Sequence, residues 1–215
     1  MRRDRAALMS WARSVRNPLG ALISLTYDKD ELVQWRAIET SGYIAALYAK
    51  PDPERVRDII RRLLWLMNDE SGGLGWRSPE LIGEILVNVP ALVPEYAKLL
   101  LSFLCEEPFE RGTHFAVYRV ASVDSKPFSE SVPRLSDSLS DIDPSIRGFA
   151  AMALGAMGVK AYHNAIQKLQ EDQSQVRLYD FTIGQMRETT VREMAKQAIG
   201  NIGIITELHK AAKAP

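Results

Sequence analysis

The sequence predicts an all-α protein, a right-handed α–α superhelix of about five stacked helical pairs, with a small β-hairpin inserted near residues 175–190. Two observations predict this fold. Apolar residues recur along most of the chain at the spacing of one helix face, and segments about 40 residues apart resemble one another. The chain of 215 residues is long enough to bury a sizeable core in such an array.

The helical periodicity is clearest in segment 145–158. Asp143 and Pro144 precede it as an N-cap and first-turn pair, and Gly158 follows it as a C-cap. Segment 53–67 has the same pattern of apolar residues. The apolar face of 145–158 consists of Ile146, Phe149, Ala150, Ala153, Leu154 and Met157.

Two pairs of segments show internal repetition. When segment 146–158 is aligned with segment 191–203, which lies 45 residues later, Arg147 aligns with Arg192. In the same alignment, Gly155 and Gly158 align with Gly200 and Gly203. A shift of 41 residues places 35–42 on 76–83, with tryptophan, arginine, glutamate and glycine in common. Periods of about 40 residues with two helices per unit are typical of helical repeat arrays.

The segment 141–158, "DIDPSIRGFAAMALGAMG", resembles a HEAT repeat of the armadillo-type α-solenoid class. It is similar to the short bacterial form found in phycobilisome-lyase-like proteins. The resemblance is sharp over 141–170 and 189–203 and looser over 30–138. It implies a fold more than an activity, because the motif residues serve packing between repeats.

We expect one continuous domain over residues 1–215. The capping region 1–29 holds two short helices broken at Asn17-Pro18, the repeats one to four occupy 30–174, and the last repeat with its hairpin occupies 175–215. The expected helical pairs are 30–48 with 53–67, 78–88 with 93–105, 111–122 with 128–139, and 145–157 with 161–170, followed by a last helix over 190–202.

Two connecting segments depart from the helical pattern. Residues 175–190 alternate apolar and polar side chains and contain threonine, valine, tyrosine and phenylalanine, which favours two short strands around a turn near 180–185. The alternative is an extended loop over the exposed end of the solenoid. The glycine-rich, acidic segment 68–75 lacks a Gly-Lys-Ser/Thr ending, so we expect a turn between repeats and no phosphate site.

Charge and cysteine content narrow the classes of function. Lysine plus arginine and aspartate plus glutamate number 27 each, and residues 68–145 are acidic, which disfavours a dedicated polyanion binder. Cys105 is the one cysteine, so no internal disulfide forms, and its apolar surroundings predict a buried, inert thiol. No apolar run reaches about 18 residues and no secretory signal begins the chain, so we expect a cytoplasmic protein.

Each repeat carries an arginine at a comparable place. The structural interpretation is that each arginine pairs with an aspartate in the neighbouring turn. The five arginines are Arg36, Arg77, Arg111, Arg147 and Arg192.

Three residues after these arginines, the repeats differ. The last two have Ala150 and Ala195, whereas the first three have Glu39, Glu80 and His114 at positions that face inward, where an unpaired charge is costly. We therefore hypothesise a polar groove that binds another protein, a peptide or a small polar ligand. The alternative is that the two glutamates pair with the arginines three residues before them. The groove would consist of Trp35, Arg36, Glu39, Trp76, Arg77, Glu80, Glu84, His114, Tyr118 and Arg119.

Two other functions stay open at this point. Nucleic-acid binding, as in the HEAT-like DNA alkylation glycosylases, would use the arginines at 2, 3, 5, 13 and 16 and those at 55, 57, 61 and 62. A lyase-like enzyme is implied by fold resemblance alone. The sequence has no catalytic signature and no Cys or His pair at ligand spacing, so we expect no catalytic residue, no metal and no cofactor.

Overall fold

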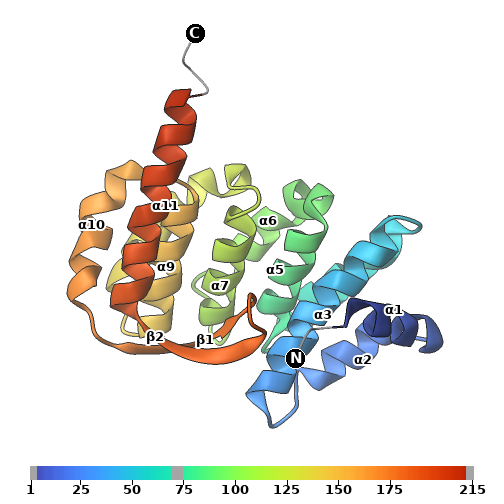
Figure 1. The fold of residues 1–215 in the computed structure, drawn as a ribbon. Coiled ribbons are helices and arrows are strands. Elements are labelled where there is room, and N and C mark those ends of the chain that lie inside the picture. Colours follow the sequence, from blue (N-terminus) through green and yellow to red (C-terminus); the bar gives the residue numbers. More distant parts are fainter. Residues whose placement is uncertain (1–3, 69–74, 212–215) are drawn as a thin grey trace.

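The computed structural model describes residues 4–68 and 75–211. Within them the chain forms eleven α-helices, several short 3-10 turns and one two-stranded antiparallel sheet. Five helices, here called the inner helices, lie side by side in chain order (Figure 1). They are α3 (Glu31–Ala49), α5 (Ser78–Asn88), α7 (Glu110–Ala121), α9 (Pro144–Ala156) and α11 (Val191–Ala211).

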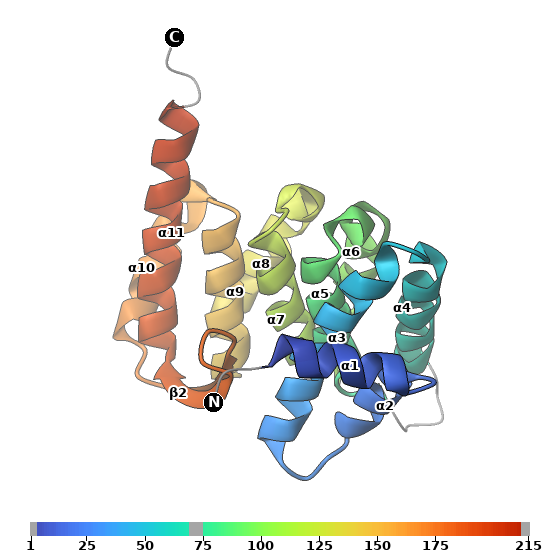
Figure 2. The same cartoon turned by 45° about the vertical axis from the view of Figure 1, so that its right-hand side comes forward.

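A second layer of outer helices lies behind the inner ones (Figure 2). Helices α4 and α6 pack against the inner helices before and after them in the sequence, and α8 and α10 pack against the inner helix that follows. The outer helices are α4 (Pro53–Asn68), α6 (Val93–Leu101), α8 (Val132–Asp137) and α10 (His163–Lys168). This alternation of inner and outer helices is the all-α solenoid that the sequence predicts.

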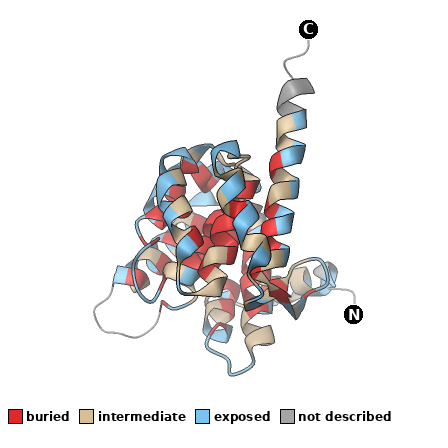
Figure 3. Ribbon diagram, turned by 90° about the vertical axis from the view of Figure 1, so that its left-hand side faces the viewer, coloured by how far each residue is buried: buried red, intermediate tan, exposed pale blue. Residues whose placement is uncertain are grey.

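Helix α9 shows how local signals and packing agree. The Asp143 side chain caps the helix by accepting a hydrogen bond from the amide of Ser145 at 2.7 Å, and Pro144 occupies the first turn. The helix ends before Gly158, whose φ of +67° suits glycine. Because neighbours cover α9 on several sides, residues from Gly148 to Gly155 are all buried. Figure 3 shows that buried residues gather in the interior, where the helices face one another.

The N-terminal cap follows the prediction of two short helices. Helix α1 (Arg5–Ser14) and helix α2 (Pro18–Leu25) are broken at Asn17, whose side chain accepts a hydrogen bond from the amide of Gly20 at 3.1 Å. Helix α2 packs on α3, and Leu19 and Leu22 form a small apolar cluster with Ile44 of α3.

The predicted hairpin is present. Strand β1 (Gln175–Asp180) pairs with strand β2 (Gln185–Thr190), with Asp180 opposite Gln185 at the turn. Gly184 closes that turn with a φ of +69°. The hairpin runs across the inner helices on the side away from the outer layer and reaches α3 (Figure 1).

Several helix ends differ from the predictions. The helix expected over 128–139 is α-helical only in α8, with 3-10 turns before and after it. Pro133 lies in the first turn of α8 and has no amide hydrogen with which to extend the helix back into the preceding turn. The helix expected over 161–170 is similarly reduced to α10. The last helix instead continues to Ala211, past its neighbours (Figure 1). Residues 69–74 of the expected turn lie outside the described ranges.

The prediction for Cys105 was wrong. Cys105 is exposed, whereas Phe103 and Leu104 are buried. Helix α6 ends at Leu101, so the helical spacing that would have turned Cys105 inward does not hold there. None of the helices in the described ranges has both the length and the apolar composition to cross a membrane.

Candidate functional site

The hairpin divides the residues of the hypothesised groove. Three of them lie beneath the hairpin tip, four line one or the other of two separate clefts, and three are enclosed between helices. The first group is Trp35, Arg36 and Glu39, the second is Trp76, Arg77, Tyr118 and Arg119, and the third is Glu80, Glu84 and His114; of this last group, Glu80 also borders a cleft.

The hairpin tip covers the polar residues of α3. The ring of Tyr179 stacks on Trp35, with ring centroids 5.9 Å apart, and its hydroxyl donates a hydrogen bond to Glu39 Oε2 at 2.6 Å. The guanidinium group of Arg36 donates to the carbonyl oxygen of Gly184 at 3.4 Å. Glu39 is only 2% exposed, so this part of the groove is occupied by the chain's own hairpin.

Glu84 and Arg119 form a buried ion pair between α5 and α7. Two nitrogens of the guanidinium group donate to the carboxylate at 2.9–3.1 Å. Burial raises the pKa of Glu84, and Arg119 opposes that shift. Arg119 also lies 4.0 Å from the ring centroid of Phe181 in the hairpin turn, so it connects the helices to the hairpin.

His114 points away from the groove. Its Nδ1 lies 2.8 Å from the carbonyl oxygen of Glu110, and its Nε2 lies 2.8 Å from the hydroxyl of Ser138, which follows outer helix α8. Burial lowers the pKa of His114, which favours the neutral ring. The residue therefore joins the two layers and does not meet Glu39 or Glu80.

The arginine series is largely structural, as the sequence suggests. Arg111 donates to Asp143 at 2.9 Å, and Arg147 donates to Asp172 at 2.9 Å; each aspartate lies in the turn of the next repeat. Arg77 pairs with Glu80 at 3.0 Å, which matches the alternative interpretation of that glutamate. Arg36 and Arg192 instead donate to the carbonyl oxygens of Gly184 and Gln170.

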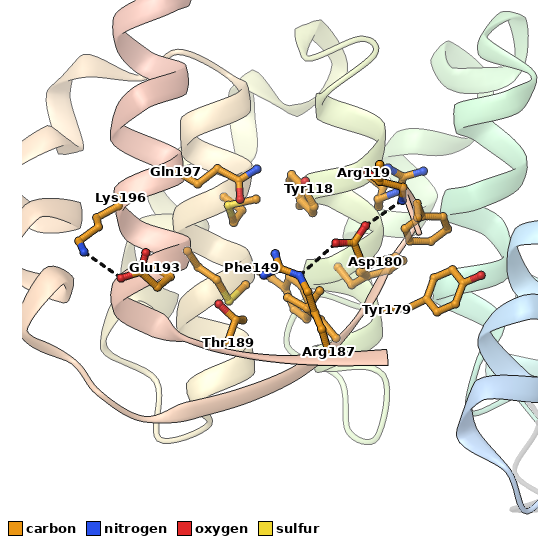
Figure 4. A pocket seen from close by; sticks show the side chains of 16 residues that line it. Tyr118, Arg119, Phe149, Tyr179, Asp180, Arg187, Thr189, Glu193, Lys196 and Gln197 are labelled. Carbon is orange, nitrogen blue, oxygen red and sulfur yellow. Dashed lines mark hydrogen bonds and ion pairs between the residues drawn. The ribbon is translucent and has the colours of Figure 1, made fainter. Parts of the chain in front are cut away.

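A cleft of about 580 Å³ opens between the hairpin and α7, α9 and α11 (Figure 4). We call it the hairpin cleft. Phe149, Met152 and Met194 contribute apolar side chains to its lining. Its polar residues include two ion pairs, Asp180 with Arg187 at 3.2 Å and Glu193 with Lys196 at 2.8 Å.

Of the ten predicted residues, the hairpin cleft contains only Tyr118 and Arg119. Burial raises the pKa of Tyr118, so its phenol keeps its proton and remains a donor at neutral pH. Sequence reasoning missed Glu193, Lys196 and Gln197 of α11 and Arg187 of β2, because these exposed polar side chains occupy ordinary surface positions of a helix and a strand. Only the hairpin prediction itself pointed to this end of the solenoid.

A second cleft of about 660 Å³ crosses the N-terminal ends of α5, α7 and α9 and shares no lining residue with the first. We call it the turn cleft. Trp76, Arg77 and Glu80 line it, as do Glu110 and Asp143.

The described residues contain no group of three or more His, Cys, Asp or Glu side chains arranged to hold a metal ion. The glutamates singled out in the sequence are instead engaged with arginine or tyrosine side chains.

Two of the four arginines of helix α4 are paired with carboxylates, and a third, Arg55, lies over the ring of Tyr48. Arg57 forms ion pairs with Glu54 at 2.9 Å and with Glu95 at 2.8 Å. Arg61 pairs with Asp58 at 2.7 Å and with Glu54 at 3.3 Å. A phosphate track along this helix would have to displace these carboxylates. Arg2 and Arg3 lie outside the described residues, and the side chain of Arg5 does too.

Comparisons with known proteins support the fold. No family model matches the chain. It is 28% identical over 161 residues to an uncharacterized protein of Archaeoglobus fulgidus, a match covering 74% of this chain and 84% of that relative. A solved engineered protein is similar at TM-score 0.53 and 18% identity, covering 86% of this chain and 79% of that one. A designed armadillo repeat protein is similar at TM-score 0.50 and 17% identity, and the match covers 86% of this chain and 82% of that one. These likenesses show an armadillo-like α-solenoid.

Proposed function

We propose that this protein is a non-catalytic scaffold that binds a peptide segment of another protein in the hairpin cleft. The observation that carries the proposal is the cleft itself, a space of about 580 Å³ between the hairpin and three inner helices. Ligand-binding pockets commonly measure about 300–1,000 Å³ and combine apolar walls with a few placed polar groups.

The lining of the hairpin cleft suits one or two apolar side chains of a peptide. Phe149, Met152 and Met194 offer rings and thioethers that adapt to differently shaped apolar groups. Tyr118 adds a phenol beside them, a group that serves both apolar contact and hydrogen bonding at interfaces.

The polar residues of the cleft suit the backbone that connects such side chains. Arg187, Lys196 and Gln197 are exposed and carry donors, while Asp180 and Glu193 carry acceptors. The sheet has two strands in the part of the chain that the structure describes, so each strand has one edge not paired with another strand. An extended peptide can add to such an edge.

The armadillo-like fold agrees with this proposal in a general way. The chain is similar in fold to a designed armadillo repeat protein. In this chain the hairpin seals the α3 end of the surface, so the proposed peptide would be confined to the part next to α7, α9 and α11.

A cavity-filling variant tests the proposal. Gln197 is an exposed residue of α11 that lines the cleft, and Gln197→Trp would fill part of it without entering the core. Gln167→Trp makes the same change on the exposed face of outer helix α10, away from the cleft. Both variants and the wild-type chain would be presented to a random peptide display library.

We expect the wild-type chain and Gln167→Trp to enrich the same peptide motif, with apolar anchors, and Gln197→Trp to lose it. The proposal fails if no motif is enriched by the wild-type chain. It also fails if Gln197→Trp enriches the motif as strongly as the wild-type chain does.

A further inference from the structure

The turn cleft is bordered by more carboxylate groups than guanidinium groups. Glu80, Glu110 and Asp143 line it, against Arg77 and Arg111. Glu110 is also close to the carboxylates of Glu106, Glu107 and Asp141, whose repulsion adds to burial in raising the pKa of Glu110. The cleft therefore has a negative potential that its own arginines do not cancel.

Both arginines of the turn cleft are already engaged. Arg77 donates to Gln34 Oε1 at 3.0–3.1 Å and to Glu80 Oε1 at 3.0 Å. Arg111 donates to Asp143 Oδ2 at 2.9 Å through its Nε. An anion entering the cleft would compete with these partners for the same N–H groups.

The helix N-termini at this cleft do not favour an anion either, although a helix start carries a partial positive charge of about half a unit. Each of the three starts already has a carboxylate of its own. Glu80 lies in the first turn of α5, Glu110 lies in the first turn of α7, and Asp143 is the N-cap of α9.

Glu80 provides a second, independent observation. Its side chain is only 5% exposed, and Oε2 has no hydrogen-bond partner among the described residues, whereas Oε1 accepts from Arg77. Oε2 lies against Gly112, where a Cβ atom would come within 2.5 Å of it. A buried carboxylate oxygen without a donor is costly, so an acceptor that no described residue satisfies lies beneath the lining of the cleft.

Two exposed aromatic rings border the same cleft. Trp76 is 64% exposed and Tyr27 is 45% exposed, and both line it. An indole face attracts a cation placed over it, and carboxylates attract the same cation through hydrogen bonds. A guanidinium or ammonium group is the ligand chemistry that uses both features.

From these observations we propose that the turn cleft binds a cationic side chain, arginine or lysine, of a basic peptide, with Trp76 against the cation and Glu110 as its carboxylate partner. Glu80 adds negative potential from beneath the cleft. This site is distinct from the hairpin cleft, and the proposal stands or falls separately from the proposed function.

The test uses the full chain and three small probes. N-acetyl-L-arginine amide and N-acetyl-L-lysine amide carry the two cations, and N-acetyl-L-citrulline amide is the neutral isostere of the first. Binding is followed by NMR through the Trp76 indole N–H and the Gly112 amide. Comparison of the arginine and lysine probes shows which cation fits better.

The matched variants are Trp76→Ala and Trp65→Ala, because Trp65 is 62% exposed on α4 and does not line the cleft. We expect saturable shifts with a cationic probe and about tenfold weaker binding of the citrulline probe. Trp76→Ala should weaken binding about threefold or more, Glu110→Gln about two- to fivefold, and Trp65→Ala should have no effect.

The proposal is overturned if neither cationic probe gives saturable shifts. Equal binding of the citrulline and arginine probes would overturn it too, as would an unchanged affinity in Trp76→Ala. If inorganic phosphate shifts the same signals and displaces the cationic probe, the arginines and not the carboxylates determine recognition, and the proposal is wrong.

Discussion

Gly155 and Gly200 occupy equivalent places in successive repeats, since a shift of 45 residues superposes them. Their surroundings nevertheless differ. A Cβ atom on Gly155 would lie 2.6 Å from Cα and 2.8 Å from the carbonyl oxygen of Ala198 in α11. A Cβ atom on Gly200 would meet nothing within 4 Å, because no described inner helix follows α11. The same substitution at both positions therefore separates packing from helix propensity.

We expect Gly155→Ala to destabilise the protein and Gly200→Ala to stabilise it. Alanine at position 200 should gain about 0.8–1 kcal/mol of helix propensity. At position 155 that gain is opposed by overpacking of about 1–3 kcal/mol. The upper part of that range applies, because the clash is with backbone atoms that cannot rotate away. The net loss at position 155 is then about 1–2 kcal/mol.

The two variants should consequently differ by about 2–3 kcal/mol in the free energy of unfolding. Urea denaturation followed by far-UV circular dichroism would measure this difference, and thermal midpoints should differ by about 4–12 °C. If Gly155→Ala stabilises the protein as much as Gly200→Ala does, the close approach of α9 and α11 is not as described, and the packing argument is refuted.

Three further predictions concern the buried polar residues. Arg119→Ala should lower the free energy of unfolding by about 3–5 kcal/mol, because it leaves the Glu84 carboxylate buried; Arg119→Ala combined with Glu84→Gln should recover part of the loss in urea denaturation. Tyr179→Phe should cost about 1–3 kcal/mol by removing the donor to Glu39, and hydrogen exchange should rise in the hairpin. Since burial raises the pKa of Glu80 in the folded state above its unfolded value of about 4.3, its charge destabilises the fold above the folded pKa. Wild-type stability should therefore rise relative to Glu80→Gln as the pH falls from 7 to about 4.5; a constant difference would contradict the shift.

Much of the fold could be predicted because local signals and periodicity agree. The Asp143-Pro144 start, the helical face that follows it and the equivalent segment 191–203 all specify stacked helices without reference to distant residues. The boundaries that were missed depend on weaker features. Pro133 limits α8, and the end of α6 at Leu101 leaves Cys105 exposed, but neither changes the apolar periodicity that was used to place the helices.

The candidate site was only partly predictable. The substitution of Glu39, Glu80 and His114 for alanine correctly marked positions where the core contains polar groups. The partners of these groups are determined by tertiary contacts far apart in the sequence. Tyr179 reaches Glu39 across 140 residues and Ser138 reaches His114 from the other layer, and no local pattern indicates either contact.

The position of the hairpin explains why the first and last repeats differ. Over α3, the inward position holds Glu39, which accepts a hydrogen bond from Tyr179 and so fixes where the hairpin tip lies. Over α9 and α11, the equivalent positions hold Ala150 and Ala195, fully buried side chains that offer the hairpin no hydrogen-bonding group. The hairpin is thus held at its tip by polar contacts and at its base by the chain leading into α11. Between these two attachments it spans the inner helices, and the space left beside it is the hairpin cleft. By holding the hairpin tip, the polar residues of the first repeat would determine the shape of the hairpin cleft, although they do not line it.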